Sequence, residues 1–542
     1  MPALAAVCCA AAVSAVSSTR AWSAGNAGVG QPAKPAPPPA AGVDAAAPRI
    51  YIKEYRVQGA HHLSAGEIEA AVYPFLGPGR AAEDVEQARA ALEKAYKDKG
   101  FQTVAVEFPE QQARGGIVVL QVEEGKVGRL RVKGSRYFSL DQIKRLAPSV
   151  AEGNVPNFND ISRDIVALNQ LPDRRVTPSL RAGGEPGTVD IDLTVKDTPP
   201  LHGSIELNNR YSADTTSLRL NGSLSYNNLW QLGHSVGVSF QIAPENTDDA
   251  KVISGYYGIR FPAVSWLSLV LQGTKQDSNV STLGGSAVAG RGEIIGARMS
   301  ATLPPGDGFY HSLSLGFDYK HFDETVRFGF SEVLTPITYY PFSASYGATW
   351  VGKSRVTELN AGINFHLRGM GGDLAAFDSK RFKADGNYFY FRGDLTHTQE
   401  LPAGFQVIGK VQGQAAGQPL LNSEQFSGGG LGNARGYLES AVLGDNGVFG
   451  SIELRSPSIF GGAKDSKNEW RIYVFCDAGM LTLNDPLPEQ ESRFDLASYG
   501  IGSHLRLFDH LNGSVDFGVP LISQSQTKAH DPQLTFRVWA DF

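Results

Sequence analysis

The residues best suited to specific chemistry are an arginine at the end of a glycine-rich stretch and an aspartate farther along the chain. Residues 425–440 read Gln-Phe-Ser-Gly-Gly-Gly-Leu-Gly-Asn-Ala-Arg-Gly-Tyr-Leu-Glu-Ser, which places Arg435 after a run of glycines. Because glycine tolerates positive φ, such a loop can fold back on itself. A guanidinium at its tip needs a carboxylate partner. The predicted partner is Asp477, which small residues flank in a strand-like run.

The order of the motifs around this pair resembles that of a known family. Gly444-Asp445, Glu453-Leu454-Arg455 and Phe475-Cys476-Asp477-Ala478-Gly479 follow the loop, as in outer-membrane transporters with periplasmic POTRA domains. The nearest branch is the TpsB transporters of two-partner secretion, the haemolysin/haemagglutinin secretion-activator family. One departure is Ala434, which stands where that family commonly has valine.

The resemblance implies that the loop around 425–440 folds into a barrel, where Arg435 meets Asp477 on the inner wall as a gating pair. The supporting motif residues surround this pair: Gly436, Tyr437, Phe475 and Gly479. The glycine after the arginine would allow the turn, the tyrosine would pack against the wall, and the last two would frame the pocket. The alternative is a surface loop whose exposed ion pair contributes under about 1 kcal/mol.

Length and composition indicate several β-rich units. The chain has 542 residues, of which 61 are glycine and 10% are aromatic. After the amino-terminal segment there is no apolar run of about 18 residues, so we expect no transmembrane helix. A barrel strand, by contrast, needs only about 9–11 alternating residues. Cys476 is the single cysteine beyond the amino-terminal segment, so neither an internal disulfide nor a cysteine metal cluster is expected.

The amino-terminal segment is predicted to be a leader followed by a linker. Residues 1–24 are rich in alanine, valine and serine, contain no acidic residue and end in small residues, as in a secretory signal peptide. A disordered alanine-rich tail is the alternative. Residues 25–48 form a Pro/Ala-rich linker that is unable to pack a core. Some relatives carry a plug helix at this place, and this composition leaves that question open.

An internal repeat follows the linker. Tyr55-Arg56-Val57-Gln58-Gly59 recurs as Leu130-Arg131-Val132-Lys133-Gly134, an offset of 75 residues. At the same offset, Ser64-Ala65-Gly66-Glu67 recurs as Ser139-Leu140-Asp141-Gln142. Both are capping-box patterns, which satisfy free amide groups at a helix start. Apolar residues then recur at helical spacing, extending to Phe75 in the first copy and to Val150 in the second, and each copy has a second amphipathic helix.

Each copy ends in two strands, the last of which cover 117–123 and 189–196. The order β-α-α-β-β is the POTRA pattern, so we predict two small α+β POTRA domains at 49–125 and 126–198. Such a domain exposes a sheet edge that can bind an extended client strand. The alternative is a pair of spacer domains. Their 21 basic and 21 acidic residues balance, which gives no indication of nucleic-acid binding.

From about residue 200 the pattern alternates with period two. Apolar residues alternate with small or polar ones in several segments, for example Val236, Val238, Phe240 and Ile242 with Ser235, Gly237, Ser239 and Gln241. A soluble β-sandwich would show the same alternation. The last segment, however, has an apolar face that ends in Phe542 and resembles the sorting signal of bacterial outer-membrane barrels.

A sheet in a bilayer must close, because an open edge there has no water to bind. The resemblance implies a 16-stranded antiparallel transmembrane β-barrel over 199–542, and the sequence alone would accept other strand numbers. This region holds 26 basic and 33 acidic residues, a net charge of −7. We therefore expect a polar, water-filled lumen rather than a packed core.

Two apparent site motifs have simpler structural explanations. Gly347–Ser354 matches G-x-x-x-x-G-K-[ST], but phosphate binding needs a helix after the lysine, and Leu359, Ala361 and Ile363 alternate as in a strand. Trp350 fits an aromatic girdle.

His61-His62 has no partners at metal-ligand spacing and fits a solvated turn. Neither H-E-x-x-H nor G-x-S-x-G occurs. We expect no nucleotide, metal or other cofactor, and no enzymatic activity.

Together with the resemblance, these features predict an outer-membrane pore with its POTRA domains in the periplasm. These domains would capture an unfolded partner exoprotein, a TpsA-type haemolysin, adhesin or contact-dependent toxin, and the barrel would pass it to the surface without ATP. The alternative is an assembly factor of the same superfamily that inserts other barrels into the outer membrane. Two repeats and a short linker favour secretion. A passive porin would leave the repeats unexplained.

Overall fold

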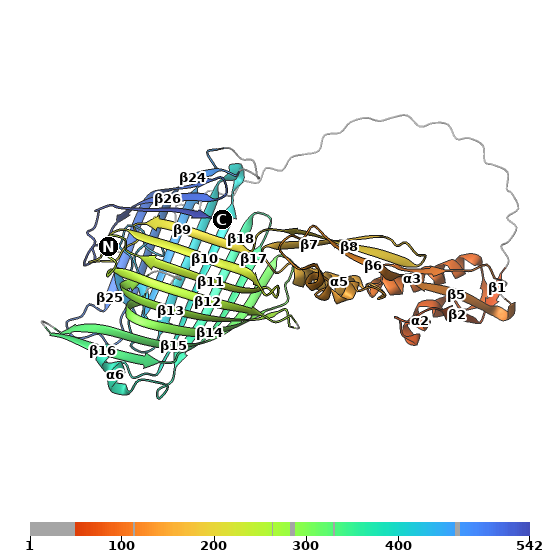
Figure 1. Ribbon diagram of the computed structural model, residues 1–542, viewed down its shortest axis with the longest axis horizontal. Coiled ribbons are helices and arrows are strands. Elements are labelled where there is room, and N and C mark those ends of the chain that lie inside the picture. The colour runs from red at the N-terminus through yellow and green to blue at the C-terminus, as the bar shows by residue number, and fades with distance from the viewer. Residues whose placement is uncertain (1–48, 112–113, 263, 282–287, 329–330, 461–466) are drawn as a thin grey trace, which may run out of the picture. The chain divides into compact units, whose positions relative to one another are not determined.

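The computed structural model describes residues 49–111, 114–262, 264–281, 288–328, 331–460 and 467–542 (Figure 1). The chain divides into two compact units, one ending at Pro199 and the other beginning at Pro200. The predicted leader (1–24) and linker (25–48) lie outside the described residues.

The first half of the amino-terminal unit has the predicted β-α-α-β-β order, with two short additional strands. Its elements are β1 (Ile50–Ile52), β2 (Glu54–Gln58), α2 (Ala65–Val72), the 3-10 helix η1 (Tyr73–Phe75), β3 (Gly77–Arg80), α3 (Ala82–Asp98), β4 (Val104–Glu107), the 3-10 turn η2 (Arg114–Gly116) and β5 (Ile117–Glu124). The sheet order is β2-β5-β4, with β2 parallel and β4 antiparallel to β5. The predicted capping box forms at Ser64 and Glu67. The apolar face of α3 packs on the sheet through Leu92 and Tyr96, which are fully buried.

The second half repeats this order. Its elements are β6 (Lys126–Lys133), α4 (Leu140–Arg145), the 3-10 helix η3 (Pro148–Val150), α5 (Phe158–Leu168), β7 (Arg174–Ala182) and β8 (Thr188–Asp197), with the sheet order β6-β8-β7. The first helix of each copy is shorter than predicted, because Phe75 and Val150 lie in 3-10 turns that begin near a proline. At Ser139 the side chain accepts from the Gln142 amide.

The two halves contact each other closely. The amide of Phe158, at the start of α5, donates to the carbonyl of Gly100, just beyond α3, at 2.9 Å. The Asn157 side-chain amide donates to the Lys99 carbonyl at 3.0 Å. The amino-terminal end of one helix therefore meets the carboxy-terminal end of another, an arrangement that satisfies free groups at both. Val155 also packs against the core of the first half, so the halves share apolar contact.

The second unit is a closed antiparallel barrel. Its strands are β9 (Leu201–Asn208), β10 (Arg219–Leu229), β11 (His234–Ile242), β12 (Ala250–Arg260), β13 (Leu267–Ser281), β14 (Val288–Thr302), β15 (Phe309–Phe328), β16 (Ser331–Tyr339), β17 (Phe342–Val351), β18 (Arg355–His366), β19 (Tyr388–Glu400), β20 (Gln406–Ala416), β23 (Asn446–Arg455), β24 (Glu469–Thr482), β25 (Arg493–Leu507), β26 (Leu511–Pro520) and β27 (Gln533–Asp541). Pairing of β27 with β9 closes the ring.

Two labelled strands share one position in this ring. β16 pairs with the half of β15 from Lys320 to Phe328, and β17 pairs with the half from Phe309 to Phe317. Counted as one interrupted strand, they give a 16-stranded barrel, which confirms the predicted fold class. The connections between strands hold α6 (Leu374–Lys380), the 3-10 turn η5 (Pro402–Gly404) and the short hairpin of β21 (Phe426–Gly428) and β22 (Val442–Gly444).

The barrel strands place apolar side chains outward and polar ones inward. Val238 and Ile253 are both 57% exposed, whereas Arg219 and Gln241 are buried. On the last strand, alternate apolar residues also face outward, as predicted. The segment 347–354 lies on β17 and the turn into β18, so a strand follows the lysine of the phosphate-loop pattern. None of the helices in the described part of the chain combines the length and hydropathy needed to cross a membrane.

Candidate functional site

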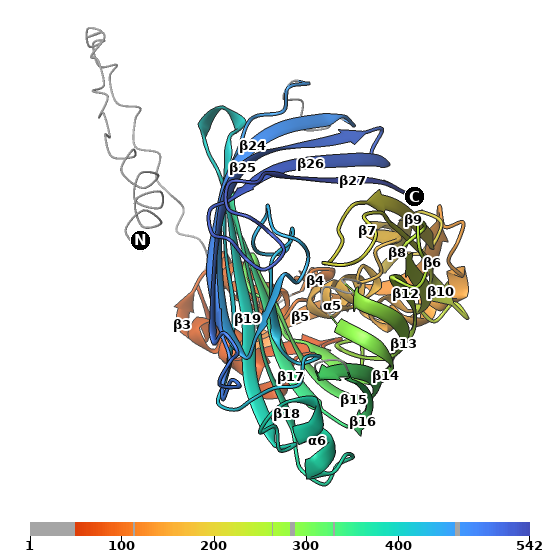
Figure 2. The ribbon, with the colours of Figure 1, turned by 90° about the vertical axis from the view of Figure 1, so that its left-hand side faces the viewer.

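Residues 417–445, between β20 and β23, form a segment that enters the ring of strands, here called the inward loop (Figure 2). Its tip carries Arg435 and Gly436. Gly436 has φ +90°, a conformation that side chains other than glycine rarely adopt. A Cβ atom at this position would lie 3.0 Å from the carbonyl group of Gly518 on β26. Gly436 therefore permits both the turn and the close approach of the tip to the wall.

The structure brings Arg435 and Asp477 together, and they make three hydrogen bonds. Asp477 lies on β24, and its Oδ2 accepts from Nε of Arg435 at 2.8 Å and from the Arg435 backbone amide at 3.0 Å. Its Oδ1 accepts from Nη2 at 2.8 Å. The two side chains are 10% and 2% exposed, respectively. The pair is thus bidentate and largely dehydrated, the geometry in which an arginine–carboxylate contact is strong.

Further wall residues complete the arginine site. Nη1 donates to Oε2 of Glu453 at 2.6 Å, and Nη2 donates to Oγ of Ser451 at 3.1 Å, both on β23. The Phe475 ring lies against the guanidinium, with its centroid 3.6 Å from Cζ. Oδ1 of Asp516 on β26 is 3.9 Å from Nη1 and accepts a hydrogen bond from the Tyr473 hydroxyl. All three guanidinium nitrogens therefore donate to the wall, through four hydrogen bonds.

Glu453 belongs to the Glu-Leu-Arg motif but was not predicted as a partner of the arginine, and Ser451 and Asp516 were not predicted at this site. Ser451 pairs directly with Asp477 across β23 and β24, and Glu453 lies on the same face two residues later. The available signal was therefore period-two spacing within one strand. It becomes usable only once the register between the two strands is known.

The charges around Arg435 are nearly balanced. Three carboxylates (Glu453, Asp477 and Asp516) surround it, Arg455 is bonded to Glu453, and Lys410 interacts electrostatically with Asp477 and Arg435. Burial alone would lower the pKa of Arg435, but Asp477 and Glu453 raise it above its usual value. The guanidinium therefore stays charged, and its removal would leave buried carboxylates without their counter-charge.

The remaining predicted residues differ in what they contact. The Tyr437 hydroxyl is buried and lies within hydrogen-bond distance of the carbonyls of Ala497 (3.0 Å) and Ile522 (2.8 Å). It therefore ties the loop to β25 and to the segment after β26. Gly479 makes room for the ring of Phe449, which an added Cβ would meet at 2.1 Å, and so acts on the packing beside the arginine pocket. Ala434 is fully buried in this packing.

The inward loop also contacts the start of the barrel. Oε1 of Glu439 accepts from Nε of Arg210 at 2.6 Å, and the Glu439 amide donates to the carbonyl of Tyr211. Both partners follow β9. The loop is therefore bonded to the segment that follows the first barrel strand as well as to strands near the carboxy-terminus.

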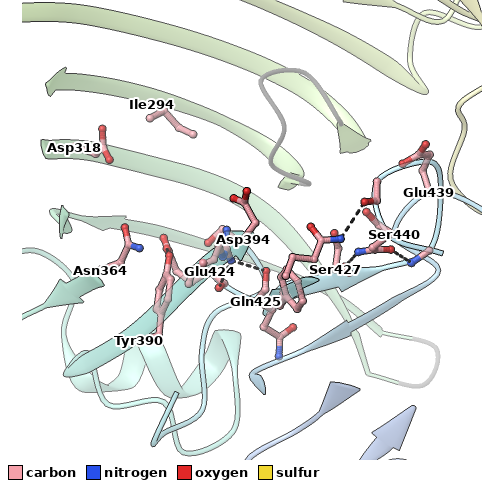
Figure 3. Close-up of a pocket in the computed structure, with 18 of the residues that line it drawn as sticks. Ile294, Asp318, Asn364, Tyr390, Asp394, Glu424, Gln425, Ser427, Glu439 and Ser440 are labelled. Carbon is pink, nitrogen blue, oxygen red and sulfur yellow. Dashed lines mark hydrogen bonds between the residues drawn. The ribbon is translucent and has the colours of Figure 1, made fainter. Parts of the chain in front are cut away.

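Between the loop and the wall lies a cavity of about 560 Å³. Figure 3 shows part of its lining, in which Tyr390, Glu424 and Gln425 follow one another and Glu439 and Ser440 lie at the other side of the view. The charged residues that line it are Arg210, Arg298, Asp318, Lys320, Arg392, Asp394, Lys410, Glu424 and Glu439. The lumen beside the loop is therefore polar, as the sequence predicts.

No group of three His, Cys, Asp or Glu side chains in the described part of the chain is arranged to hold a metal ion. At the His61-His62 pair, both backbone amides and Nδ1 of His62 contact the Glu124 carboxylate. These contacts fix a turn beside the end of β5.

Comparison with known families agrees with the fold. The POTRA domain model of ShlB type matches residues 50–125. The model of haemolysin secretion/activation proteins ShlB/FhaC/HecB matches residues 187–505, more than half of the chain. The chain belongs to this family. The resemblance to TpsB transporters is thereby confirmed.

Individual relatives agree with this assignment. The chain is 25% identical over 505 residues to the outer membrane transporter CdiB of Escherichia coli O6:K15:H31, covering 90% of this chain and 81% of CdiB. Its fold is similar to the structure of CdiB from Escherichia coli, with a TM-score of 0.66, 20% identity and coverage of 93% and 92% of the two chains. BamA from Haemophilus ducreyi lacking POTRA domains 1-3 has a similar fold, with a TM-score of 0.55, 16% identity and coverage of 91% and 100%.

This TpsB protein is an outer-membrane transporter that secretes a partner exoprotein, and members of its family are transporters rather than enzymes. Its POTRA domains lie in the periplasm. Outer-membrane barrels have short periplasmic turns and longer extracellular loops. The inward loop and the connection that contains α6 join strands at the long-loop end, so both belong to the cell-surface side.

Proposed function

We propose that the inward loop is the gate of this TpsB transporter and that Arg435 holds the gate closed. The observation that carries the proposal is that all three guanidinium nitrogens donate to Asp477, Glu453 or Ser451 on the inner wall. A loop fixed in this way occupies the lumen at rest. Passage of an extended polypeptide requires the loop to shift, because a chain segment and the loop cannot fill the same space.

The chemistry of this contact suits a gate with two positions. Breaking a buried ion pair leaves both charges without partners, so intermediate positions of the tip are costly. A chain entering the lumen can offer new polar partners and admit water, which lowers that cost. The loop therefore rests in the bonded position and moves when the lumen is occupied.

We assign client capture to the outer edge of β2 in the first POTRA domain, because the chain itself partly occupies the other three sheet edges. Arg89 donates to the carbonyl of Val106 on β4 at 3.0 Å. The Asn169 side chain bonds both the amide and the carbonyl of Val176 on β7, and Glu152 accepts the amide of Leu130 on β6.

By contrast, the described residues outside its own sheet give no hydrogen bond to the outer edge of β2 at 54–58. An extended client strand can add to such an edge through main-chain hydrogen bonds, which read shape rather than sequence. The partner class that fits is therefore an unfolded, β-prone exoprotein, such as a haemolysin, an adhesin or a contact-dependent toxin.

The energy for transport comes from the client rather than from a nucleotide in this proposal. Folding of the exoprotein outside the cell withdraws segments from the unfolded pool, which makes passage directional. The transporter then needs no ATP, no metal and no enzymatic activity of its own. The outward apolar face of the barrel contacts outer-membrane lipids.

The experiment that tests the gate uses a strain from which this gene has been deleted and which carries the partner exoprotein. Complementation with the wild-type gene restores exoprotein to the medium. Arg435→Ala leaves buried carboxylates without their counter-charge, so the loop loses its defined position and lies in the path of the client. We therefore expect this variant to release no exoprotein and to retain it in the periplasm. The matched control is Arg493→Ala, because Arg493 is an exposed arginine bonded to exposed Asp495 on β25. Both variants remain inserted and heat-modifiable.

Normal secretion by Arg435→Ala would contradict the assigned role. A general fall in other barrel proteins in the deleted strain would instead favour the assembly-factor alternative.

In the same strain, a photoactivatable crosslinker attached to the cysteine of Arg56→Cys, in a Cys476→Ser background, captures the client at the β2 edge. The control, Ala105→Cys on β4, gives little crosslinking. Equal crosslinking at both positions would contradict the assignment of client capture to β2.

A further inference from the structure

A second carboxylate of the inward loop is buried away from Arg435. Oε1 of Glu424 accepts from Nζ of Lys320 at 2.6 Å and from the Tyr339 hydroxyl at 2.6 Å. Its Oε2 accepts from the Tyr390 hydroxyl at 2.8 Å. The side chain of Glu424 is 2% exposed and that of Lys320 is 15% exposed. All three donors therefore converge on one dehydrated anion (Figure 3 shows Tyr390 beside Glu424).

The donors come from another arc of the barrel than the partners of Arg435. Lys320 lies on β15, Tyr339 on β16 and Tyr390 on β19, whereas Arg435 contacts β23 and β24. Apolar packing surrounds the contact, since Tyr339 and Tyr390 belong to a buried cluster with the residues Phe322, Ile337, Phe377, Ala384, Tyr388, Leu420 and Leu421. This cluster also includes α6, through Phe377.

The ends of the inward loop are braced to each other. Asp445, which is fully buried, accepts from the amide of Leu420 at 2.9 Å and from Nε2 of Gln425 at 3.0 Å. Arg392 and Gln414 both donate to the carbonyl of Glu424. The amino-terminal leg of the loop is thus a braced segment. It meets the β15–β19 arc through the apolar contacts of Leu420 and Leu421, through the Glu424 carbonyl and, as its one ionised contact there among the described residues, through the Glu424 carboxylate.

A buried ion pair is a poor source of stability, because dehydration of the two charges offsets their attraction. Packed apolar side chains at these positions would hold the leg at least as firmly. What the charged contact adds is specificity of position together with sensitivity to water, since hydration of the carboxylate removes the advantage of its three donors. An anchor with these properties suits a contact that must form in one place and also be released.

We infer that Glu424 is a positioning residue, a second anchor that holds the amino-terminal leg of the inward loop against β15, β16 and β19 independently of Arg435. This inference rests on the proposed gate. With both anchors formed, the loop spans the lumen between two arcs. Release of the Glu424 anchor frees the leg and enlarges the cavity that Lys320, Tyr390 and Glu424 line, while the arginine site stays formed.

The test measures ion conductance of the full-length protein in planar lipid bilayers. Glu424→Gln keeps the shape of the side chain but removes its charge, so the time-averaged conductance rises by roughly tenfold, the population shift expected when charge-assisted hydrogen bonds are lost. Lys320→Met gives a similar rise. Because both substitutions break one contact, the double variant conducts no more than either single variant.

The matched control is Glu293→Gln, which breaks the exposed pair of Glu293 with Lys275 in the same barrel and leaves conductance unchanged. Heat-modifiability shows whether each variant is assembled. If Glu424→Gln does not assemble, Tyr390→Phe decides, because it removes a single donor: a rise supports the anchor, and wild-type conductance overturns it.

Additive effects of Glu424→Gln and Lys320→Met would show that the two residues act separately and would overturn the inference. Arg435→Ala separates this inference from the gate. If Arg435→Ala changes secretion while Glu424→Gln leaves conductance at the wild-type level, only the second anchor is wrong. If Arg435→Ala leaves both secretion and conductance unchanged, the gate itself is wrong.

Discussion

The POTRA unit buries its apolar side chains, whereas the barrel exposes apolar side chains on its outer face and buries charged ones inside. In the POTRA unit, Leu92 and Leu120 are fully buried between helices and sheet. In the barrel, Ile253 is 57% exposed, whereas Asp445 and Asp477 are buried. Water drives apolar residues inward in the first case. Lipid accepts them outward in the second, and the lumen then holds the charged groups.

In both units, the interactions that stabilise the fold differ from the groups that carry the function. A POTRA domain owes its fold to an apolar core, and its function depends on strand edges that the fold leaves open. The barrel owes its fold to a closed ladder of backbone hydrogen bonds, so its interior is free to hold ionised contacts. Arg435–Asp477 and Lys320–Glu424 are such contacts, and both join the loop to the wall.

The largest effect is expected in the apolar core of the first POTRA domain. Leu92→Ala removes a fully buried side chain and should destabilise this unit by about 2–5 kcal/mol, through lost burial and the cavity left behind. Protease digestion of the full-length protein in liposomes measures the loss, while the barrel stays heat-modifiable. Val166→Ala on α5, where the side chain is 55% exposed, is the control and changes stability by at most about 0.5 kcal/mol. Equal protease sensitivity of the two variants would contradict this picture of the core.

A slightly smaller effect, confined to the barrel, should distinguish two adjacent residues on β12. Ile253→Arg puts a charge on the lipid face and should cost up to about 2–4 kcal/mol, the range for an arginine at the bilayer midplane. Ser254 points the other way and shares a hydrogen bond with Thr274. Ser254→Arg should therefore be tolerated in the polar lumen. The urea midpoint for barrel refolding into vesicles measures both changes, and the reverse order of effects would mean that the faces are misassigned.

The smallest effect depends on pH and is confined to the POTRA unit. Burial alone would raise the pKa of Glu124, but hydrogen bonds from the amides of His61 and His62, from the His62 ring and from Tyr96 lower it below its ordinary value of 4.5. A carboxyl group whose pKa falls on folding stabilises the fold above its unfolded pKa, and this contribution is lost as the pH falls through the folded pKa.

Glu124→Gln should therefore lower the stability of the POTRA unit at pH 7, and its difference from wild type should shrink as the pH falls below about 4.5. The difference is measured by heating the full-length protein at several pH values and using the protease sensitivity of this unit to detect its unfolding. Glu123→Gln, the exposed neighbour, is the control. A difference that stays constant with pH would exclude the charge of Glu124 as its source.

Local patterns predicted much of the fold. The offset repeat with its capping boxes predicted two copies of the β-α-α-β-β order, because helix starts and sheet periods are encoded by nearby residues. Period-two alternation predicted the barrel strands, including the strand after Lys353. The helix boundaries differ from the prediction: Phe75 and Val150 are predicted on helices but lie in 3-10 turns, because prolines end the regular helix there.

Some contacts of the inward loop were also predictable from sequence motifs, whereas others required the tertiary structure. Arg435 and Asp477 were predicted as partners, because a motif resemblance links them although 42 residues separate them. Glu453 and Ser451 needed the register between β23 and β24. Glu424 and Lys320, which are 104 residues apart, have no sequence motif that joins them. Only closure of the barrel brings β15, β16 and β19 around the leg of the loop.

Neighbouring residues along the chain specify the type and order of the elements, the outward and inward faces of the strands, and the arginine motif at the tip of the loop. These depend on backbone propensities and periodicities that a few neighbouring residues set. The tertiary structure decided which side chains meet across the lumen and which sheet edges stay open. Such contacts depend on strand register and ring closure, and one residue of slip would turn each inward side chain toward the lipid.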